Sequence, residues 1–403
     1  MPGERGGMTS VYIKNIGLLL SGELSNPVLK NDAILIEDKL IKALGDSKVM
    51  PQPEGVLVID AAGAAVMPGM IDSHCHPVLG DFTPRQLTIN YLESTLHGGV
   101  TTAVSAGEVH LPGRPKDPAG VKALAILAAK SFQTYRPGGL KVLGGAVILE
   151  KGLTEADFEE LAGQGVKVVG EVGLGSVKDP QEAAPMIAWA KKNGMVVMMH
   201  TGGTSIPGSS TVSADMVMAA DPDIVSHING GPTAVSREEA FKLIDQTQYT
   251  LEIVHCGNPL RAVEVARRIH QRKEYQRLII GNDAPSGTGV VPLGLLRTLN
   301  LICALGGIPP ELAVCMATGN TARVFGLNRG IIAPGKEADL VFLDASLGSV
   351  GDDLLSCLVA GDNPGISIVM VDGQVLFKVS RNTPPPKRAA TVVGGALRAE
   401  RGA

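Results

Sequence analysis

Residues 68–77 read PGMIDSHCHP, in which two histidines stand one residue apart at the end of an apolar run. Side chains of a β-strand alternate between its two faces, so His74 and His76 point the same way and Cys75 points the other way. Two imidazoles that face one space suit a metal ion, which needs several converging ligands. Two polar residues on a turn would give the same short pattern, so the rest of the chain must supply further ligands.

The totals favour a folded protein that acts on a small molecule. The chain has 403 residues, 44% hydrophobic content and a net charge of −4, with no basic region for nucleic acid. Apolar stretches are shorter than the roughly 18–20 residues of a membrane span, and the first residues lack the apolar centre of a signal peptide, so we expect a cytoplasmic protein without membrane contact. The five cysteines lack CxxC spacing and indicate buried apolar residues rather than disulfides.

Between residues 62 and 325, short β-rich runs alternate with longer amphipathic segments, as in βα units around a parallel sheet. One such segment, 154–165, has Thr154 and Asp157 at capping positions of a helix. Eight β runs are present: AAVMPGMIDSHCH (64–76), VTTAVSAG (100–107), LKVLGGAVIL (140–149), VKVVGEVGLG (166–175), MVVMMHTGG (195–203), DIVSHING (223–230), YTLEIVHCG (249–257) and RLIIGNDAPSG (277–287). The pattern predicts a closed (β/α)8 TIM barrel over residues 66–328, with its chemistry at the C-terminal ends of the strands.

The two ends of the chain carry a different pattern. Residues 1–65 and 329–403 contain short alternating runs with hairpin turns such as Asp372-Gly373. We expect the two ends to pair as one β-sandwich beside the barrel, and residues 382–403 to form a weakly structured tail.

Polar residues gather where the predicted barrel strands end, and those ends converge at one mouth of a barrel. They are His74 and His76 on the first run, Glu171 on the fourth, His200 on the fifth, His227 on the sixth, His255 near the end of the seventh and Asp283 on the eighth. Any one of them could make a structural hydrogen bond or cap a turn. Their coincidence at consecutive strand ends predicts a metal centre.

This order of residues resembles that of the amidohydrolase superfamily, metal-dependent hydrolases built on a TIM barrel with a flanking β-sandwich. The strings LHGGVTT (96–102) and GIIAPGKEADLVFLD (330–344) also resemble its signatures. The resemblance implies two divalent metal ions, zinc with or without iron. It places His74, His76 and Asp283 on the first ion and His200 with His227 on the second.

The bridge between the two ions has two candidates on the fourth strand. The superfamily often uses a carbamylated lysine there, and Lys167 lies four residues before Glu171 on the same face. A carboxylate can bridge two cations without modification, and Glu171 is nearer the C-terminal end of the strand. We therefore assign the bridge to Glu171 and assign Lys167 to packing or to the surface.

Further strings, among them GEVGLG (170–175) and GNDAPSGTG (281–289), resemble cyclic-amide hydrolases of this superfamily. The resemblance implies a homo-oligomer, a tetramer, and a small anionic cyclic amide opened by a metal-bridging hydroxide, with Asp283 as general base and then general acid. Candidate substrate contacts are His255, Thr201, Thr204, Ser286, Arg85, Arg114 and Lys116. Alternatives are a dihydroorotase-like, hydantoinase-like or imidazolonepropionase-like enzyme, or a non-catalytic oligomeric scaffold.

Overall fold

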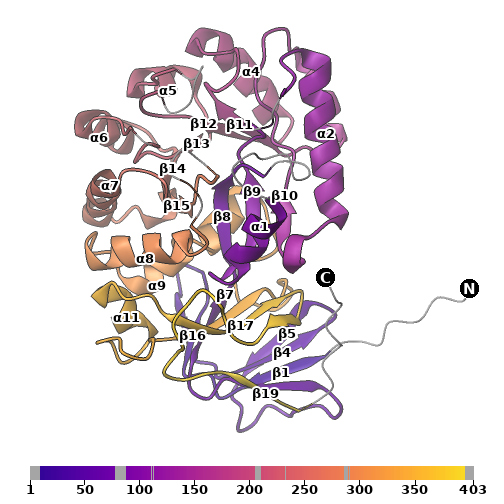
Figure 1. The fold of residues 1–403 in the computed structure, drawn as a ribbon, viewed down its shortest axis with the longest axis vertical. Helices are drawn as coiled ribbons and strands as arrows, with labels where there is room; N and C mark the ends of the chain where they lie inside the picture. Colours follow the sequence, from indigo (N-terminus) through magenta and orange to yellow (C-terminus); the bar gives the residue numbers. More distant parts are fainter. Residues whose placement is uncertain are drawn as a thin grey trace, which may run out of the picture.

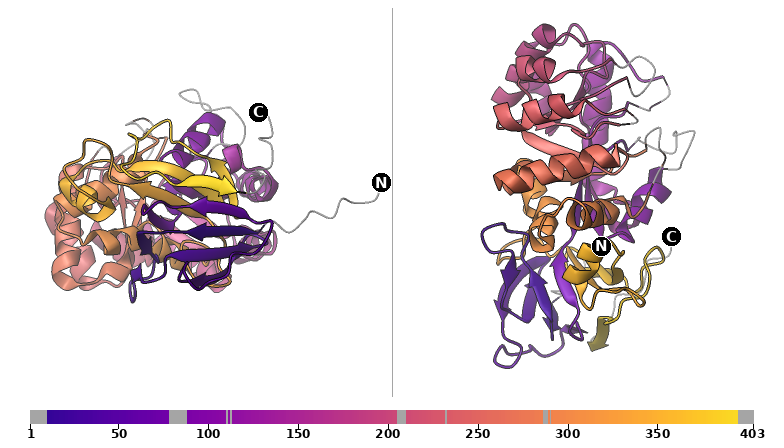
Figure 2. Two further views of the ribbon diagram at one scale, coloured as in Figure 1. Left: turned by 90° about the horizontal axis from the view of Figure 1, so that it is seen from below. Right: turned by 90° about the vertical axis from the view of Figure 1, so that its left-hand side faces the viewer.

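The protein is described by a computed structural model that covers residues 10–77, 88–109, 111, 113–204, 210–231, 233–285, 289 and 291–394. It consists of a barrel and a β-sandwich that lie end to end (Figure 1). The strands of the sandwich come from the N-terminal and the C-terminal parts of the chain, whose indigo and yellow ribbons lie side by side (Figure 2). The expected fold class, a TIM barrel with a flanking sandwich, is confirmed.

Eight strands form the barrel: β8 (Met70–Cys75), β9 (Val100–Ser105), β10 (Lys141–Leu143), β11 (Val168–Val172), β12 (Val196–Met199), β13 (Ile224–Val225), β14 (Thr250–Val254) and β15 (Leu278–Gly281). They pair in parallel as β10-β9-β8 and as β11-β12-β13-β14-β15. Two isolated bridges, Val147 to Val169 and Cys75 to Ala284, join these sheets into a closed ring. The strand ends with the predicted ligands therefore meet at one mouth.

A helix follows each barrel strand and covers the outside of the ring (Figure 1). The helices are α1 (Thr88–Leu96), α2 (Pro118–Thr134), α3 (Glu155–Gly163), α4 (Pro180–Lys192), α5 (Ala214–Ala220), α6 (Arg237–Gln246), α7 (Pro259–Arg272) and α8 (Gly294–Ala304), with short 3-10 turns at Pro137–Gly139 and Tyr275–Arg277. Thr154 and Asp157 form the capping box of α3, as their spacing predicts. Two further helices, α9 (Pro310–Met316) and α10 (Gly319–Val324), lead to Phe325, which packs with the inward-facing residues Ile71 and Ile279.

The sandwich has two sheets that enclose a separate apolar core. One has the order β19-β6-β1-β4-β5 and the other β18-β17-β16-β7-β2-β3. The bounds are β1 (Val11–Lys14), β2 (Leu18–Leu20), β3 (Val28–Leu29), β4 (Ala33–Glu37), β5 (Leu40–Gly45), β6 (Leu57–Asp60), β7 (Ala65–Pro68), β16 (Leu340–Asp344), β17 (Gly365–Val371), β18 (Gln374–Phe377) and β19 (Thr391–Gly394), with α11 (Leu354–Ala360) before β17. Val66 of β7 pairs with Phe342 of β16, so the two ends of the chain are joined in one sheet.

Two details differ from the sequence prediction. The first β run is two strands, because the chain turns from the sandwich into the barrel at Gly69, and β7 therefore belongs to the sandwich rather than to the barrel. Part of the predicted weakly structured tail is ordered, since β19 pairs with β6. Arg388 anchors this segment through two hydrogen bonds, 2.6 and 2.7 Å long, to the buried carboxylate of Asp344.

A buried charge cluster joins the barrel to the sandwich. The Nζ atom of Lys141, at the start of β10, lies 2.7 Å from Glu337, 2.9 Å from Asp339 and 2.6 Å from Asp372. The lysine side chain is only 5% exposed. The three carboxylates are close enough together to suggest a cation site, but the lysine ammonium already supplies the positive charge there.

Two predictions from composition can be compared with the described residues. All five cysteines are buried thiols. In the described part of the chain, no helix has both the length and the apolar character needed to cross a membrane.

Candidate metal centre

Six side chains with metal-binding atoms meet at the mouth of the barrel. Each comes from the end of a strand or from the first two residues after it, and each residue is at most 7% exposed: His74, His76, Glu171, His200, His227 and Asp283. Burying so many ionisable groups together is costly unless they pair with one another or bind a metal. The predicted ligands, spread over some two hundred residues of sequence, therefore share one space.

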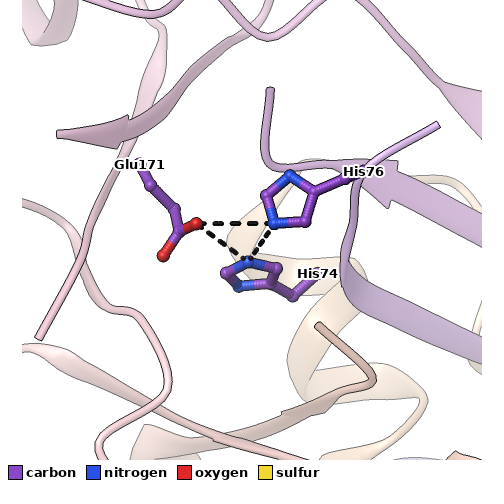
Figure 3. Close-up of side chains that lie close together, drawn as sticks. All are labelled: His74, His76 and Glu171. Atoms are coloured by element: carbon purple, nitrogen blue, oxygen red, sulfur yellow. Dashed lines mark hydrogen bonds and ion pairs between the residues drawn. The ribbon is translucent and has the colours of Figure 1, made fainter. Parts of the chain in front are cut away.

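The first group has the dimensions of a tetrahedral metal site. The Nε2 atoms of His74 and His76 are 3.3 Å apart and lie 3.4 and 3.5 Å from Oε2 of Glu171, and the three side chains point toward one another (Figure 3). Oδ1 of Asp283 lies 3.6 and 3.3 Å from the same two nitrogens. Ligands about 2.1 Å from a tetrahedral ion are about 3.4 Å from one another, so the two imidazole nitrogens and Oε2 of Glu171 have the spacing of three corners of a zinc site, and Oδ1 of Asp283 lies at a similar distance from both nitrogens.

The second group uses the other oxygen of Glu171. Oε1 lies 3.6 Å from Nδ1 of His200 and 2.5 Å from Nε2 of His227, and these two nitrogens are 3.1 Å apart. The contact between Glu171 and His227 is a hydrogen bond and is shorter than a ligand-to-ligand edge. Because one carboxylate oxygen faces each group, Glu171 has the placement of a bridging ligand. Lys167 is exposed at the opposite end of the strand.

Hydrogen bonds fix the orientation of three of the imidazoles. Nδ1 of His74 lies 2.7 Å from Glu252, Nδ1 of His76 lies 2.8 Å from the carbonyl of Gly107, and Nε2 of His200 lies 3.2 Å from the carbonyl of Gly203. A carboxylate or carbonyl can only accept, so each of these outer nitrogens carries a proton, and the inner nitrogen is the one that faces the centre. Nδ1 of His227 has no hydrogen-bond partner within the described residues.

The charges of the centre compensate one another. Burial opposes ionisation of Glu171, but the imidazoles of His74 and His227 outweigh it and hold the pKa of this carboxyl well below its usual range. Burial likewise disfavours the cationic form of His74, yet Glu252 and Glu171 raise its pKa well above the usual value. The negative carboxylates thus attract either protons or cations, and a metal ion must displace protons to bind.

Asp283 is ionised by its surroundings. Burial alone would raise its pKa, but the hydrogen bond to His76 and the nearby His74 and His227 lower it below the usual aspartate value. The side chain is 11% exposed. It combines a carboxylate charge with some access to the mouth of the barrel.

Two of the ligands have a strained backbone conformation. His227 has a φ of 34° and Asp283 a φ of 55°, in the left-handed region that costs a residue with a Cβ atom of order 1 kcal/mol or more. Specific bonds hold these conformations. The Asp283 N–H donates to the carbonyl of His74 at 2.8 Å, and the His227 N–H donates to Glu252 at 3.3 Å.

Two buried acids that sequence reasoning did not single out support the ligands. Asp72 accepts hydrogen bonds from the backbone N–H of His74 and from both the backbone and the side-chain amide of Asn282, and burial raises its pKa to about 7. Glu252 contacts His74 and His227. Both acids lie inside apolar strand runs, MIDSH and TLEIV, and a buried acid at such a position needs a strong partner. An acidic residue inside an apolar strand run was therefore the feature of the sequence that could have identified Asp72 and Glu252.

The predicted substrate contacts have diverse surroundings. His255 follows β14, is partly buried, and its Nδ1 atom lies 3.4 Å from the hydroxyl of Thr298. Burial and the nearby Arg297 lower its pKa to about 4, so its imidazole is neutral near pH 7. The hydroxyl of Thr201 is fully buried and donates to the carbonyl of Ser226 at 2.7 Å.

The other substrate candidates are less informative. Arg114 pairs with the buried carboxylate of Glu150 at 2.9 Å, and Thr204 and Lys116 are exposed. Arg85 and Ser286 lie outside the described residues.

A closed (β/α)8 barrel with two groups of buried metal-binding atoms at the C-terminal ends of its strands defines a metal-dependent hydrolase of the barrel-and-sandwich type. The family model described as "Amidohydrolase family" matches residues 235–376. Enamidase of Eubacterium barkeri is 56% identical over 386 residues, which are 96% of this chain and 100% of the relative. The chain belongs to the amidohydrolase family, and the predicted family, fold and hydrolase class are confirmed.

Solved structures give the same result. A crystal structure of enamidase superposes with a TM-score of 0.93, and the alignment covers 96% of this chain and all of that one. A β-aspartyl dipeptidase of Fervidobacterium islandicum, 19% identical, superposes with a TM-score of 0.67 over 92% of this chain and 98% of that one, and shares the fold. In the comparison of sequences, a more distant relative is adenine deaminase of Brucella abortus, which is 24% identical over 84% of this chain and 54% of its own length. The family implies divalent metal ions, for which the two groups of ligand atoms are suited.

Proposed function

We propose that this hydrolase opens a small anionic cyclic amide by the reaction of enamidase, which converts 6-oxo-1,4,5,6-tetrahydronicotinate and water to 2-formylglutarate and ammonia. The observation that carries this proposal is 56% identity along the full length of enamidase. With this reaction we also propose a role in the degradation of nicotinate, in the cytoplasm. The substrate is small and carries a carboxylate, so its recognition needs both the metal centre and a hydrogen-bond donor for the anion.

The ligand geometry supports two divalent ions, with His74, His76 and Asp283 on the first, His200 and His227 on the second, and Glu171 between them. Such ions, when bound, activate water near neutral pH and polarise the amide carbonyl. We assign zinc, with or without iron, from the family resemblance, because imidazole and carboxylate ligands without thiolate also admit manganese and cobalt and do not choose among these metals. Elemental analysis of protein from its native host that found only magnesium would contradict the assignment.

Asp283 is the candidate general base and general acid. Its lowered pKa keeps the carboxylate ionised at neutral pH, and its Oδ1 atom lies 3.3 Å from Nε2 of His76, at the edge of the first group. From this position the carboxylate can accept a proton from water and deliver it to the ring nitrogen as the C–N bond breaks. The nitrogen then leaves as an enamine, which tautomerises to an imine and loses ammonia on hydrolysis.

His255 is the candidate partner of the substrate carboxylate. With a pKa of about 4 it carries no charge at neutral pH, so it would act as a hydrogen-bond donor rather than as a cation. A neutral donor discriminates less strongly than an arginine would, which leaves the metal centre as the main determinant of binding.

A substrate panel tests the proposal. Purified enzyme is assayed with 6-oxo-1,4,5,6-tetrahydronicotinate, dihydroorotate, hydantoins and imidazolone propionate, and we expect turnover of the first compound to exceed that of the others. Turnover confined to dihydroorotate or hydantoin would reject the enamidase assignment and leave the hydrolase class intact. Less than half an equivalent of metal in protein made with metal supplied would favour the non-catalytic scaffold.

We also propose a homotetramer. Light scattering after size-exclusion chromatography should then give four times the 41.8 kDa mass of the chain. A mass of one or two chains at micromolar concentration would contradict this assembly.

A further inference from the structure

Glu252 is a fully buried carboxylate in the middle of β14, and the proposed reaction leaves it without a role. It comes from the seventh barrel strand, yet its partner His74 lies on the first, 178 residues earlier in the chain. A carboxylate at such a position costs several kcal/mol unless its partners are strong and well oriented. The partners of this carboxylate therefore indicate its structural role.

The two carboxylate oxygens have different partners. Oε2 accepts the Nδ1–H of His74 at 2.7 Å and the backbone N–H of His227 at 3.3 Å. Oε1 accepts the hydroxyl of Ser73 at 2.5 Å. A single oxygen thus touches one histidine of the first ligand group and one histidine of the second.

Each of these contacts constrains a ligand. The bond to Nδ1 fixes the tautomer and the ring orientation of His74 and makes Nε2 a stronger electron donor. The bond to the backbone N–H supports the left-handed conformation of His227, whose φ is 34°. His227 has no other side-chain acceptor for its backbone N–H among the described residues.

We infer that Glu252 is a positioning residue that orients one histidine in each metal group, so that both ions depend on the same buried carboxylate. The inference rests on the proposed two-ion centre but not on the substrate assignment. Metal affinity, measured without any substrate, therefore tests it independently of the enamidase reaction.

Glu252→Gln is the informative variant because the amide has the shape of the carboxylate. Its carbonyl can replace Oε2 toward His74 and His227, while its NH2 group faces Ser73, whose hydroxyl can accept as well as donate. The variant replaces the charge-assisted bonds of the carboxylate by weaker neutral ones, so both histidines are held less firmly and Nε2 of His74 becomes a weaker electron donor. Ser73→Ala removes only the Oε1 contact. Asp223→Asn is the matched control, because Asp223 also lies at a barrel strand and accepts a backbone N–H, that of Val197, without contacting a ligand.

The experiment titrates the metal-free proteins with Zn²⁺ in competition with a chromogenic chelator, and far-UV circular dichroism confirms folding. We expect Glu252→Gln to weaken zinc binding by about 10- to 100-fold, as loss of such outer partners does elsewhere. Ser73→Ala and Asp223→Asn should stay within about threefold of the wild type, because both keep the carboxylate of Glu252 on the ligands. Visible absorption of the Co²⁺-substituted protein should change in Glu252→Gln and not in the control.

A folded Glu252→Gln protein with wild-type zinc affinity and an unchanged Co²⁺ spectrum would overturn the inference. If Glu252→Gln does not fold, Glu252→Asp decides, because it keeps the charge but withdraws it from the histidines by one methylene. A folded Glu252→Asp protein with at least tenfold weaker zinc binding supports the inference. Unchanged affinity, or failure of this variant to fold as well, assigns Glu252 to folding instead and overturns it.

Discussion

Replacing Lys141 by methionine removes the positive charge at the centre of the cluster between barrel and sandwich. Three carboxylates, those of Glu337, Asp339 and Asp372, lie within 2.9 Å of its Nζ atom. Asp339 is fully buried, and burial raises its pKa even with the lysine present. Without Lys141, Arg136 still lies 2.6 Å from Asp372 and Arg329 lies 2.9 Å from Glu337, but the buried Asp339 keeps only Arg329, at 4.0 Å, among the described residues.

The size of the effect follows from burial. Breaking a buried ion pair by removing one partner costs about 3–5 kcal/mol, because an uncompensated charge stays behind. The entropy of unfolding is about 2.1 cal/mol/K per residue, or about 0.8 kcal/mol/K for this chain, so the midpoint should fall by about 4–6 °C. Lys192→Met is the control, since Lys192 also makes a 2.6 Å ion pair, with Glu155, but is 66% exposed. An exposed pair contributes little to stability, which predicts a shift of the midpoint of no more than about 1 °C.

Differential scanning calorimetry of the wild type and the two variants, under the same metal loading, measures both shifts. The reasoning predicts a clear separation between the buried and the exposed lysine. Equal shifts for Lys141→Met and Lys192→Met, or a Lys141→Met protein within 1 °C of the wild type, would refute it.

Three further predictions concern the bridging ligand Glu171, the substrate candidate His255 and the effect of His97 on stability. Glu171→Gln should lower metal content and activity together while Lys167→Ala leaves both intact; a carbamylated Lys167 in the mass spectrum, with loss of both metals on its replacement, would reverse the assignment. His255→Gln keeps a neutral donor, so KM should stay within about fivefold of the wild type, whereas His255→Leu should raise KM by about tenfold through loss of one hydrogen bond; the pH profile of KM between pH 6 and 8 should not change in either variant, and a change would show that His255 titrates there. Burial and the neighbouring Arg381 lower the pKa of His97 from 6.5 to about 4, so between these pH values the unfolded chain binds one more proton than the folded protein and stability is lost as the pH falls. The urea midpoint of His97→Gln should therefore fall less than that of the wild type between pH 7 and pH 5, and parallel curves would count against this account.

The sequence was informative where local pattern and barrel geometry act together. Strand ends fix which residues face the mouth, so His200 and Asp283 could be placed without any knowledge of their neighbours. Glu252 could not, because its role depends on the contact between the seventh strand and His74 of the first, which no local pattern encodes. Thr201 directly follows the ligand His200, which made it a candidate substrate contact. Its hydroxyl donates to a backbone carbonyl, a contact that the local sequence does not reveal.

The boundary between the two parts was misplaced for a similar reason. The run from residue 64 to 76 is continuously apolar, and only the pairing of Val66 with Phe342 shows that its first half belongs to the sandwich. The same holds for β19, whose order comes from β6 and from Asp344 rather than from its own composition. Pairing between distant segments is what a single sequence reveals least.

The direct passage from β7 into β8 has a consequence for how the protein is made. His74 follows the last residue of β7 by only six positions, and β7 gains its neighbour β16 at residues 340–344. A nascent chain that has already emerged past Asp283 carries all six ligands, yet the strand that anchors the first two still has an open edge. Productive metal uptake should therefore wait until the C-terminal strands have left the ribosome, and a barrel produced alone, ending near residue 328, should be a poor metal binder although no ligand is missing.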